Sequence, residues 1–400
     1  MIDELALRIN DLAVFAGLWK DPCVAAFFRL VQKSADRDRI TVIRKAYAEF
    51  AHELYEQDEQ DWTAYLQRRV LELDNVCVRY AAREHEIPGL ILDGAMSELE
   101  TLSKLAALGP RDFFDQDDLA KWGSYPIDLQ AEYLSRLMHI SKYGYGEFAR
   151  YSMFRLKKIH DDSQEYRLIP IVHPDPITFE ELYGYEEQQK ALRDNTRVLM
   201  NDQLTSNALL YGSPGTGKSA SVKAVLNEFA PQGLRLIEVG KKDLPLLPDL
   251  MDDLSGQPLK FILFIDDLTF QDGENDFAAL KAVLEGSASA RSRNTVIYAT
   301  SNRRHMVKET FSSREGDDVH RNETIQETIS LSDRFGLRLY YDKPSARQYA
   351  SIVEGLCREK KMRCTPQLLT EAESFALRQS GRSARAARQF VEQKAAMREE

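Results

Sequence analysis

A glycine-rich segment between an expected strand and an expected helix constrains this chain more than any other stretch. The segment is Gly212-Ser213-Pro214-Gly215-Thr216-Gly217-Lys218-Ser219, between the apolar run 208–211 and a helical pattern at 220–229. Its glycines allow a tight turn whose backbone N–H groups face phosphate oxygens, and the helix N-terminus adds the positive end of its dipole. The complete G-x-x-x-x-G-K-[ST] spacing therefore predicts a phosphate-binding loop.

Phosphate chemistry assigns roles within this loop. Lys218 is expected to reach the β- and γ-phosphates of a nucleotide, and the Ser219 hydroxyl to ligate Mg²⁺. The other positions expected to line the phosphates are Gly212, Ser213, Pro214, Gly215, Thr216, Gly217 and Ala220. The loop predicts a nucleoside triphosphate and Mg²⁺ as ligands.

Short apolar runs alternate with helical patterns from Thr178 onward. Strands are expected at 208–211, 234–239, 261–265, 295–299 and 337–341, with helices at 186–199 and 220–229. This alternation predicts an α/β fold whose parallel sheet has helices on both faces. After Pro344, helical patterns at 346–359, 367–379 and 384–399 predict a small helical lid.

The part of the chain before this alternation is expected to be helical. Apolar residues recur at helical spacing, as at Ile2, Leu5, Ile9 and Leu12, and no strand-like alternation stands out. Three prolines within 160–176 each block helix continuation. We therefore expect an all-α N-terminal domain at 1–158, a linker at 159–177, an α/β nucleotide-binding domain at 178–343 and the lid at 344–400. The N-terminal domain is either a partner-docking module or an ordinary helical bundle, and its role cannot be inferred from sequence.

A second motif lies at the end of the expected strand 261–265, which runs directly into Asp266-Asp267. A buried strand places Asp266 at the carboxyl edge of the sheet, beside the phosphate loop, where a carboxylate can hold the water shell of Mg²⁺. Asp267 is then positioned to orient or deprotonate an attacking water. Acidic turns often follow strands, so this interpretation depends on the phosphate loop upstream.

The next expected strand ends in Thr300-Ser301-Asn302. Asn302 is a candidate contact to the attacking water or the γ-phosphate, with a turn-forming asparagine as the simpler alternative. The following Arg303, Arg304 and His305 face either a neighbouring subunit or solvent.

Two arginine motifs follow the phosphate loop, the acidic pair and Asn302 along the chain. Arg334 precedes the last expected strand, and Gly381-Arg382-Ser383-Ala384-Arg385 lies in the lid. The order of motifs resembles that of the AAA+ ATPases. The resemblance implies that ATP and Mg²⁺ are the cofactors, that Arg334 enters a neighbouring subunit's site as a finger, and that Arg385 contacts the γ-phosphate. Arg382 and Arg388 are close enough to exchange with Arg385 in that role.

The resemblance also covers residues before the loop. The segment 179–186 resembles the AAA+ entry segment that packs on adenine, which assigns Tyr183, Gly184 and Tyr185 to the base. The runs 264–270, 299–305 and 329–336 are similar to a narrower group, the uncharacterised bacterial AAA+ family known as domain of unknown function 815. This resemblance covers roughly residues 140 to 395. It implies no established substrate.

One departure from the common AAA+ pattern concerns the acidic pair. Asp267 stands where glutamate is usual, and its side chain is one methylene shorter, so water activation is expected to be slower or to need closure by a neighbour. The run Gly240-Lys241-Lys242-Asp243-Leu244 also lacks the aromatic-apolar-glycine pore loop of protein unfoldases. Threading of polypeptide through a ring is therefore disfavoured.

The favoured interpretation is an ATPase that hydrolyses ATP at a subunit interface and remodels an unknown protein partner, which the N-terminal domain recruits. The resemblance implies a homo-oligomer, with a hexamer as one candidate. The first alternative is a slowly hydrolysing, ATP-dependent switch or loader that recruits a protein or DNA-bound partner through the N-terminal domain. A DNA-linked loader is the second, supported by Lys241-Lys242, Arg303-Arg304 and a lid series expected on one helical face: Arg378, Arg382, Arg385 and Arg388. The net charge of −10 counts against broad nucleic-acid adhesion.

Cysteine spacing and hydropathy bear on location. The four cysteines are far apart without a C-x-x-C pair, which argues against zinc or a disulfide framework. No apolar run approaches the roughly 20 residues that span a bilayer, and the acidic start Met1-Ile2-Asp3-Glu4 is unlike a signal peptide. We expect a cytoplasmic protein without membrane contact.

Overall fold

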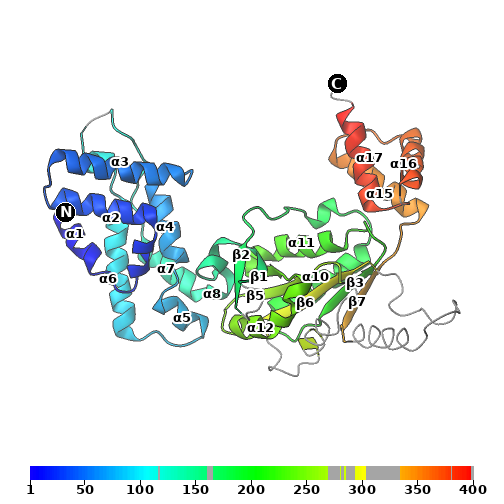
Figure 1. Cartoon of the computed structure of the whole chain (residues 1–400), viewed down its shortest axis with the longest axis horizontal. Helices are drawn as coiled ribbons and strands as arrows, with labels where there is room; N and C mark the ends of the chain where they lie inside the picture. The colour runs from blue at the N-terminus through cyan, green and yellow to red at the C-terminus, as the bar shows by residue number, and fades with distance from the viewer. Residues whose placement is uncertain are drawn as a thin grey trace. The chain divides into compact units, whose positions relative to one another are not determined.

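The computed structural model describes residues 1–115, 118–159, 165–268, 280, 283–284, 293–302, 334–379 and 381–397 (Figure 1). The chain divides into two compact units, Met1–Arg150 and Tyr151–Glu400. Among the described helices, none has the length and apolar character needed to cross a bilayer.

The first unit is helical, as expected. Its helices are α1 (Ile2–Asn10), α2 (Pro22–Ala35), α3 (Ile40–Glu56), α4 (Trp62–Glu72), α5 (Val76–Ala82), α6 (Gly89–Ala106), α7 (Leu129–Met138), α8 (Ile140–Tyr143) and α9 (Glu147–Arg150). Trp62 is fully buried, and its ring centroid lies 4.1 Å from that of Phe27 and 5.1 Å from that of Phe50. Aromatic rings from α2, α3 and α4 therefore form one core.

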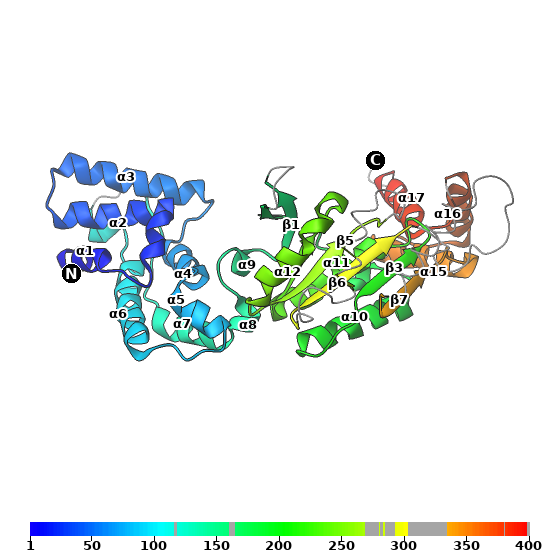
Figure 2. The same ribbon diagram turned by 60° about the horizontal axis from the view of Figure 1, so that its bottom comes forward.

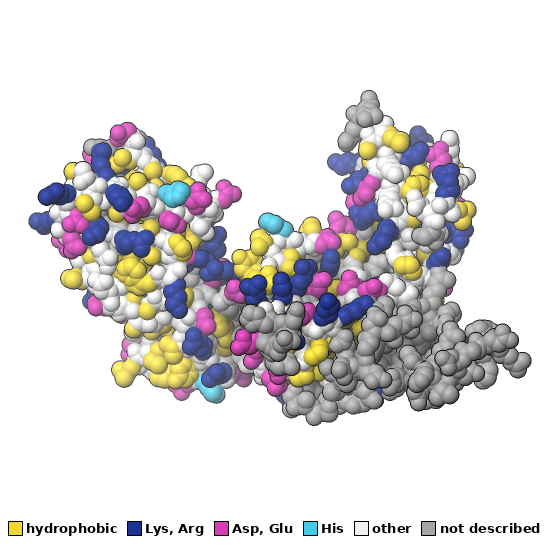
Figure 3. Space-filling view, viewed as in Figure 1, with side chains coloured by type: hydrophobic (Ala, Val, Ile, Leu, Met, Phe, Trp, Pro, Cys, Tyr) yellow, Lys and Arg dark blue, Asp and Glu magenta, His cyan; other side chains and the backbone are white. Residues whose placement is uncertain are grey.

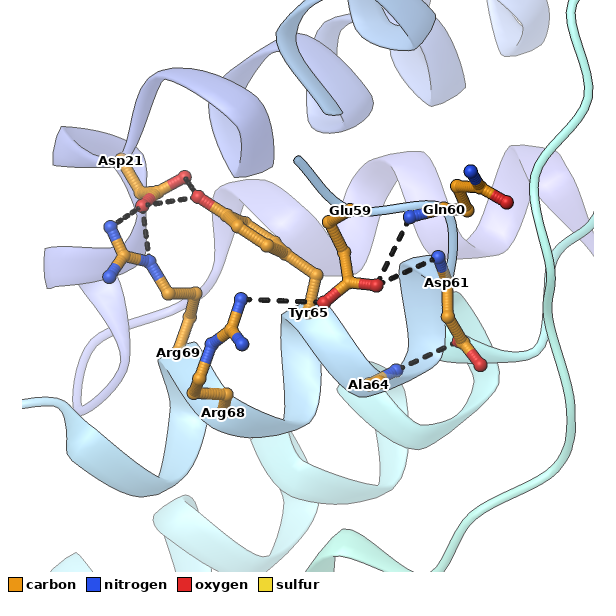
Figure 4. Close-up of polar contacts among 8 residues, drawn as sticks. All are labelled: Asp21, Glu59, Gln60, Asp61, Ala64, Tyr65, Arg68 and Arg69. Carbon is orange, nitrogen blue, oxygen red and sulfur yellow. Dashed lines mark hydrogen bonds and ion pairs between the residues drawn. The ribbon is translucent and has the colours of Figure 1, made fainter. Parts of the chain in front are cut away.

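A buried carboxylate joins two of these helices (Figure 4). Asp21 caps α2 by accepting a hydrogen bond from the Val24 N–H at 3.0 Å. The same carboxylate accepts from the Tyr65 hydroxyl at 3.0 Å and pairs with Arg69, both from α4. Burial, together with Asp21, raises the pKa of Tyr65. The carboxylate thus fixes α4 against the N-terminus of α2.

The second unit is built on a sheet of seven strands (Figure 2). The strands are β1 (Met153–Lys158), β2 (Tyr166–Pro170), β3 (Ala208–Gly212), β4 (Leu234–Glu238), β5 (Lys260–Ile265), β6 (Thr295–Ser301) and β7 (Leu337–Tyr341). Their order is β2-β1-β4-β5-β6-β3-β7, and every neighbouring pair is parallel except β1 with β2. The predicted α/β fold with a mostly parallel sheet is confirmed.

Helices pack on the sheet through alternating strand residues. Leu210 and Phe264 share a buried cluster with Leu192 of α10 (Glu186–Met200) and Val225 of α11 (Lys218–Phe229). The leucines of α12 (Leu247–Ser255) are buried outside this cluster, and α12 contacts β6. Since successive strand residues point to opposite faces, α12 covers the other side of the sheet.

The expected boundary between helices and linker was wrong. Strand β1 lies within the segment expected to be helical, and strand β2 lies within the expected linker at 159–177. The signal was short: Phe154 and Leu156 are buried while Arg155 and Lys157 are exposed. Pro170 fits this sheet because it ends an edge strand, where its missing N–H breaks no ladder.

The lid consists of α15 (Ala346–Glu359), α16 (Pro366–Arg378) and α17 (Ala384–Ala396), close to the expected helices. It has its own core, which includes Tyr349, Val353 and Phe390. The lid arginines were expected on one helical face, and this was wrong. Arg378 ends α16, Arg382 lies in the turn and Arg385 begins α17, because the turn divides the series between two helices.

Candidate nucleotide-binding site

The glycine-rich loop joins β3 to α11 in a backbone conformation that requires glycine. A Cβ at Gly212 would lie 2.2 Å from the carbonyl oxygen of Tyr341 in β7, and φ there is +129°. Gly215 and Gly217 have φ of +72° and +93°, in the region that other residues avoid. The Ser213 N–H donates to the same Tyr341 carbonyl at 2.8 Å. The loop is therefore pinned to the neighbouring strand as it leaves the sheet.

Lys218 lies at the first turn of α11 and is 5% exposed. Its Nζ donates to the carbonyl oxygens of Ser213 at 2.7 Å and Gly212 at 3.2 Å. Burial lowers the pKa of Lys218 to about 8, although Asp267 and Asp266 oppose the shift. An anion within reach of Nζ would favour the charged form, so the position suits a phosphate.

The predicted metal-binding pair meets across the sheet edge. The Ser219 hydroxyl donates to Asp266 Oδ1 at 2.6 Å, joining the loop to the end of β5. Thr300 of β6 donates to the same Oδ1, also at 2.6 Å. Asp266 is exposed and Thr300 is buried. One carboxylate oxygen therefore joins three elements of the site.

Asp267 has an unusual backbone conformation for a residue with a side chain, with φ of +53°. Its N–H donates to the Thr300 hydroxyl oxygen at 2.9 Å. Its carboxylate accepts a hydrogen bond from Asn302 Nδ2 at 2.7 Å. Left-handed backbone at a non-glycine residue costs about 1–2 kcal/mol. Thr300 of β6 thus holds the backbone of Asp267, and Asn302, directly after β6, holds its side chain.

The lid reaches the phosphate loop through the first turn of α17. The Arg385 N–H donates to the carbonyl oxygen of Gly215 at 3.1 Å. A Cβ at Gly215 would lie 3.3 Å from the Cβ atoms of Arg385 and Ser383. The absence of a side chain at Gly215 therefore permits this close approach between lid and loop.

The three candidate lid arginines differ in their contacts. Arg382 pairs with Glu373 of α16, with Nε 2.7 Å from Oε1. Arg388 donates to the backbone carbonyl of Glu181 at 3.2 Å and lies 3.7 Å from Glu359. Arg385 lines the cavity, and its side chain has no ion pair or hydrogen bond within the described part of the chain. Arg385 remains the candidate whose guanidinium is available to a phosphate.

The expected adenine segment contacts both the lid and the sheet. Tyr183 packs against the lid core, and a Cβ at Gly355 of α15 would lie 2.3 Å from its ring. Tyr185 packs against the sheet core, and its hydroxyl donates to the Asp342 carbonyl at 2.6 Å, just before the lid. Gly184, with φ of +81°, lies between them. The ring of Tyr183 is thus shared between the cavity wall and the lid core.

A cavity of about 480 Å³ gathers most of the predicted site residues. Those that line it are Tyr183, Gly184, Tyr185, Pro214, Gly215, Thr216, Gly217, Lys218, Ser219, Ala220, Asp266, Asp267, Asn302 and Arg385. Gly212, Ser213 and Arg334 do not line it. Arg334 is half-buried shortly before β7, and its role in a neighbouring site stays a prediction. Arg303, Arg304 and His305 lie outside the described residues.

Sequence reasoning missed three positions that shape this cavity. Thr300 contacts both aspartates, although only Asn302 of its run was assigned a role. Gln189 donates to the carbonyls of Leu182 and Gly184 at 3.0 Å and 2.7 Å, which orders the entry segment. Gly355 admits the Tyr183 ring. Of these, only Thr300 had a sequence signal, since it ends a buried strand beside the acidic pair.

The donor set of the site fits Mg²⁺. Ser219 and Asp266 supply hard oxygen atoms that already lie 2.6 Å apart, and Asp267 adds a second carboxylate nearby. Magnesium in nucleotide sites uses one or two carboxylates and completes its shell with waters and phosphate oxygens. The residues present would therefore hold the ion together with the phosphates of a nucleotide.

A family model described as a protein of unknown function, DUF815, matches residues 149–398. The chain belongs to the DUF815 family. This match confirms the resemblance to domain of unknown function 815 that was expected from the sequence. The helical unit lies outside the match, except at its last residues.

Two curated relatives match only a short part of the DUF815 protein. The large subunit of replication factor C from Nanoarchaeum equitans is 28% identical over 113 residues, 27% of this chain and 26% of its own. Proteasome-activating nucleotidase 1 from Haloferax volcanii is 32% identical over 71 residues, 16% of this chain and 18% of its own. This chain spans about a quarter or less of either relative.

Among solved structures, the AAA domain of FIGL-1 in complex with ADP is similar to the DUF815 protein at 19% identity. The match covers 56% of this chain and 75% of that one, with a TM-score of 0.37.

Proposed function

We propose that this DUF815 protein binds Mg-ATP in the cavity between sheet and lid, and hydrolyses it to change the geometry between them. The observation that carries the proposal is the convergence on one cavity of the phosphate loop, the acidic pair, Asn302 and Arg385. Each group comes from a different strand end or from the lid. Convergence of these chemical types supports phosphoryl transfer to water more than a passive glycine turn.

Each residue has a defined task in this proposal. The loop N–H groups and Lys218 bind phosphates, and Ser219 and Asp266 are the magnesium ligands. Bound magnesium would neutralise charge on the transferred phosphoryl group. Asp267 accepts a proton from the attacking water, and Asn302, which already contacts that carboxylate, orients the water.

Movement of the lid follows from its contacts with the site. The Arg385 N–H bond to Gly215 lies beside the position for phosphates, and Tyr183 links the entry segment to α15. A nucleotide that enters the cavity would have to share or alter both contacts. We propose that the presence or absence of the γ-phosphate sets the position of the lid, with Arg385 as its sensor.

Assembly is part of the same proposal. Arg334 lies outside the lining of its own cavity and, as a finger, would complete a neighbouring subunit's site in a homo-oligomer, with a hexamer as one candidate. Arginine fingers contribute about 10³ to 10⁵ in rate. The helical unit would recruit the remodelled protein partner.

The deciding experiment measures ATP turnover over a series of protein concentrations, together with particle size. Turnover per subunit should rise with concentration. Asp267→Asn, which keeps the shape of the side chain, and Arg334→Ala should each abolish turnover while ATP binding persists, whereas Lys218→Ala should abolish binding. Unchanged ATP affinity in Lys218→Ala would contradict the phosphate site. Turnover independent of concentration in a monomer would contradict the finger in trans.

One observation favours a second function, an ATP-dependent switch with negligible hydrolysis. Asn302 holds the carboxylate of Asp267 at 2.7 Å, and that side chain is already short for a base. Tight ATP binding that drives assembly without measurable phosphate release would support the switch. Phosphate release on the scale of about 1–100 per second per subunit would exclude it.

A further inference from the structure

The edge ribbon formed by β1 and β2 carries opposed like charges. Lys157 lies directly opposite Arg167 in the antiparallel register, and both side chains are exposed. Like charges directly opposite on one face of a sheet destabilise it. Neither side chain has an ion pair or a hydrogen bond with any residue that the structure describes. Within the described residues, this cross-strand pair is therefore an unfavourable arrangement of charge.

Two further cations extend this charged ribbon. Arg155 shares its face with Lys157, and its guanidinium lies 3.0 Å from Glu238 of β4, with the arginine side chain 61% exposed. Exposed Lys242 follows β4 in the next segment, which contacts β1. The neighbouring carboxylate of Asp243 already accepts a backbone hydrogen bond from Lys158. We call Arg155, Lys157, Arg167 and Lys242 the basic ribbon.

The basic ribbon and the nucleotide site both lie at the carboxyl ends of the parallel strands. Lys157 ends β1, Lys242 follows β4, and Arg167 begins antiparallel β2, so all three are at the carboxyl edge of the parallel strands. Figure 3 shows a row of Lys and Arg side chains across the part of this unit where Figure 1 labels β1 and β2. A polyanion bound there would lie along the same edge as the phosphate loop.

Protection of the edge strand from pairing with another sheet does not explain why both opposed charges are positive. Edge strands commonly carry lysine or other charges to prevent pairing with another sheet. Charges of mixed sign would serve that purpose equally well and would add a favourable cross-strand pair. Two opposed cations are instead suited to a ligand with closely spaced negative charges.

We propose that the basic ribbon binds the sugar–phosphate backbone of duplex nucleic acid. Pairing of β1 with β4 ends at Arg155, and beyond it β1 and β2 continue as a two-stranded ribbon. The major groove of B-DNA admits a two-stranded ribbon, and phosphates offer one negative charge per about 1.7 Å of helix axis. Single strands are recognised by exposed aromatic platforms. Of the two aromatic residues in these strands, Phe154 is buried and Tyr166 is half-buried with its hydroxyl donating to Asp253, so neither is a fully exposed platform. This proposal does not depend on ATP hydrolysis.

The test measures binding of the full chain to a fluorescent DNA duplex, without nucleotide, from about 50 to 200 mM salt. The variant is Lys157→Gln with Arg167→Gln. Loss of two phosphate contacts should lower affinity about 60-fold at 0.1 M salt and reduce the salt slope by about 2. The matched control is Lys20→Gln with Arg29→Gln, which removes two exposed cations from the helical unit and should leave affinity within about threefold.

The unfolding temperature distinguishes a binding role of Lys157 and Arg167 from a structural role. The ribbon variant should unfold at the same temperature as the wild type or a higher one, because the substitution relieves like-charge repulsion. If the ribbon variant unfolds at a lower temperature, the binding test uses Lys242→Gln instead, because Lys242 lies outside the pairing of β1 with β2. This variant should reduce the salt slope of DNA binding by about 1. An unchanged slope in that variant would overturn the proposal.

Other ligand classes give distinct results. Absence of duplex binding at low salt, equal affinity of the ribbon variant, or preference for single strands or for anionic vesicles would each overturn the proposal. ATP turnover, measured on the same samples without DNA, should be unchanged by the ribbon substitutions. Failure of the basic ribbon is thereby distinguishable from failure of the ATPase.

Discussion

Replacement of Thr300 by valine should lower ATP turnover with little effect on ATP affinity. Valine keeps the shape of threonine but lacks the hydroxyl that donates to Asp266 at 2.6 Å and accepts from the Asp267 N–H at 2.9 Å. Thr300 is 2% exposed, so water cannot easily replace it in either contact. The substitution therefore removes one contact of the Asp266 carboxylate and the contact of the Asp267 N–H without touching the phosphate loop.

The expected size follows from these two hydrogen bonds. A hydrogen bond to a charged group contributes about 1.5–3 kcal/mol, which exposure of the Asp266 carboxylate reduces to about 0.5–1.5 kcal/mol. The neutral bond from the Asp267 N–H adds about 0.5–1.5 kcal/mol, which gives about 1–3 kcal/mol in total. The left-handed backbone of Asp267 costs about 1–2 kcal/mol that the Thr300 contact offsets. Since about 1.4 kcal/mol is tenfold in population, the fraction of molecules with Asp267 in place should fall about 5- to 100-fold.

The assay is steady-state phosphate release with a parallel ATP titration. In Thr300→Val, kcat should fall about 5- to 100-fold while the ATP dissociation constant changes less than about threefold, because Lys218 and the loop are intact. Thr300→Ser, which keeps the hydroxyl, should stay close to wild type. Wild-type kcat in the valine variant would refute the positioning role. An equal loss in both variants would indicate that packing at this position, and not the two hydrogen bonds alone, is required.

Three further predictions follow from other contacts. Gly355→Ala should destabilise the protein by about 1–3 kcal/mol and weaken ATP binding, because its Cβ would lie 2.3 Å from the Tyr183 ring. The same substitution should have little effect in a Tyr183→Ala background, and additive losses in unfolding temperature would contradict the contact. ATP binding near pH 8.5 should take up protons, because burial lowers the pKa of Lys218 to about 8 and bound phosphates restore its charge. Affinity should accordingly fall as the pH rises above 8, and calorimetry in two buffers of different ionisation enthalpy would disprove this if it found no net uptake. Arg69→Leu should cost about 3 kcal/mol in unfolding free energy by stranding a buried carboxylate, whereas Arg68→Leu, from an exposed pair at 3.6 Å, should cost less than about 1 kcal/mol. Equal losses from the two would argue against the buried pair.

Strands of the central sheet were predictable because they are apolar and bounded by polar turns. The last strand, Leu337–Tyr341, has the expected bounds, and β5 begins one residue earlier than expected. The edge strands β1 and β2 were not predictable in the same way. Their alternation spans only a few residues, and prolines nearby indicated a linker.

The candidate site likewise combines residues that the sequence predicts with residues that only the tertiary structure identifies. Loop, acidic pair and Asn302 carry residue types that chemistry requires at fixed spacing, and the structure lines one cavity with members of each. The choice among Arg382, Arg385 and Arg388 depended on partners far away in sequence, such as Glu373 and the Glu181 carbonyl. No local pattern reveals those partners.

The sequence by itself determined the phosphate loop and the alternation of strands and helices, because backbone sterics and hydrophobic burial act over a few residues at a time. The tertiary structure alone decided that Thr300 holds both aspartates, that Gly355 admits Tyr183, and that Lys157 opposes Arg167. Each of these depends on strand register or helix packing between distant segments, which local propensity does not encode.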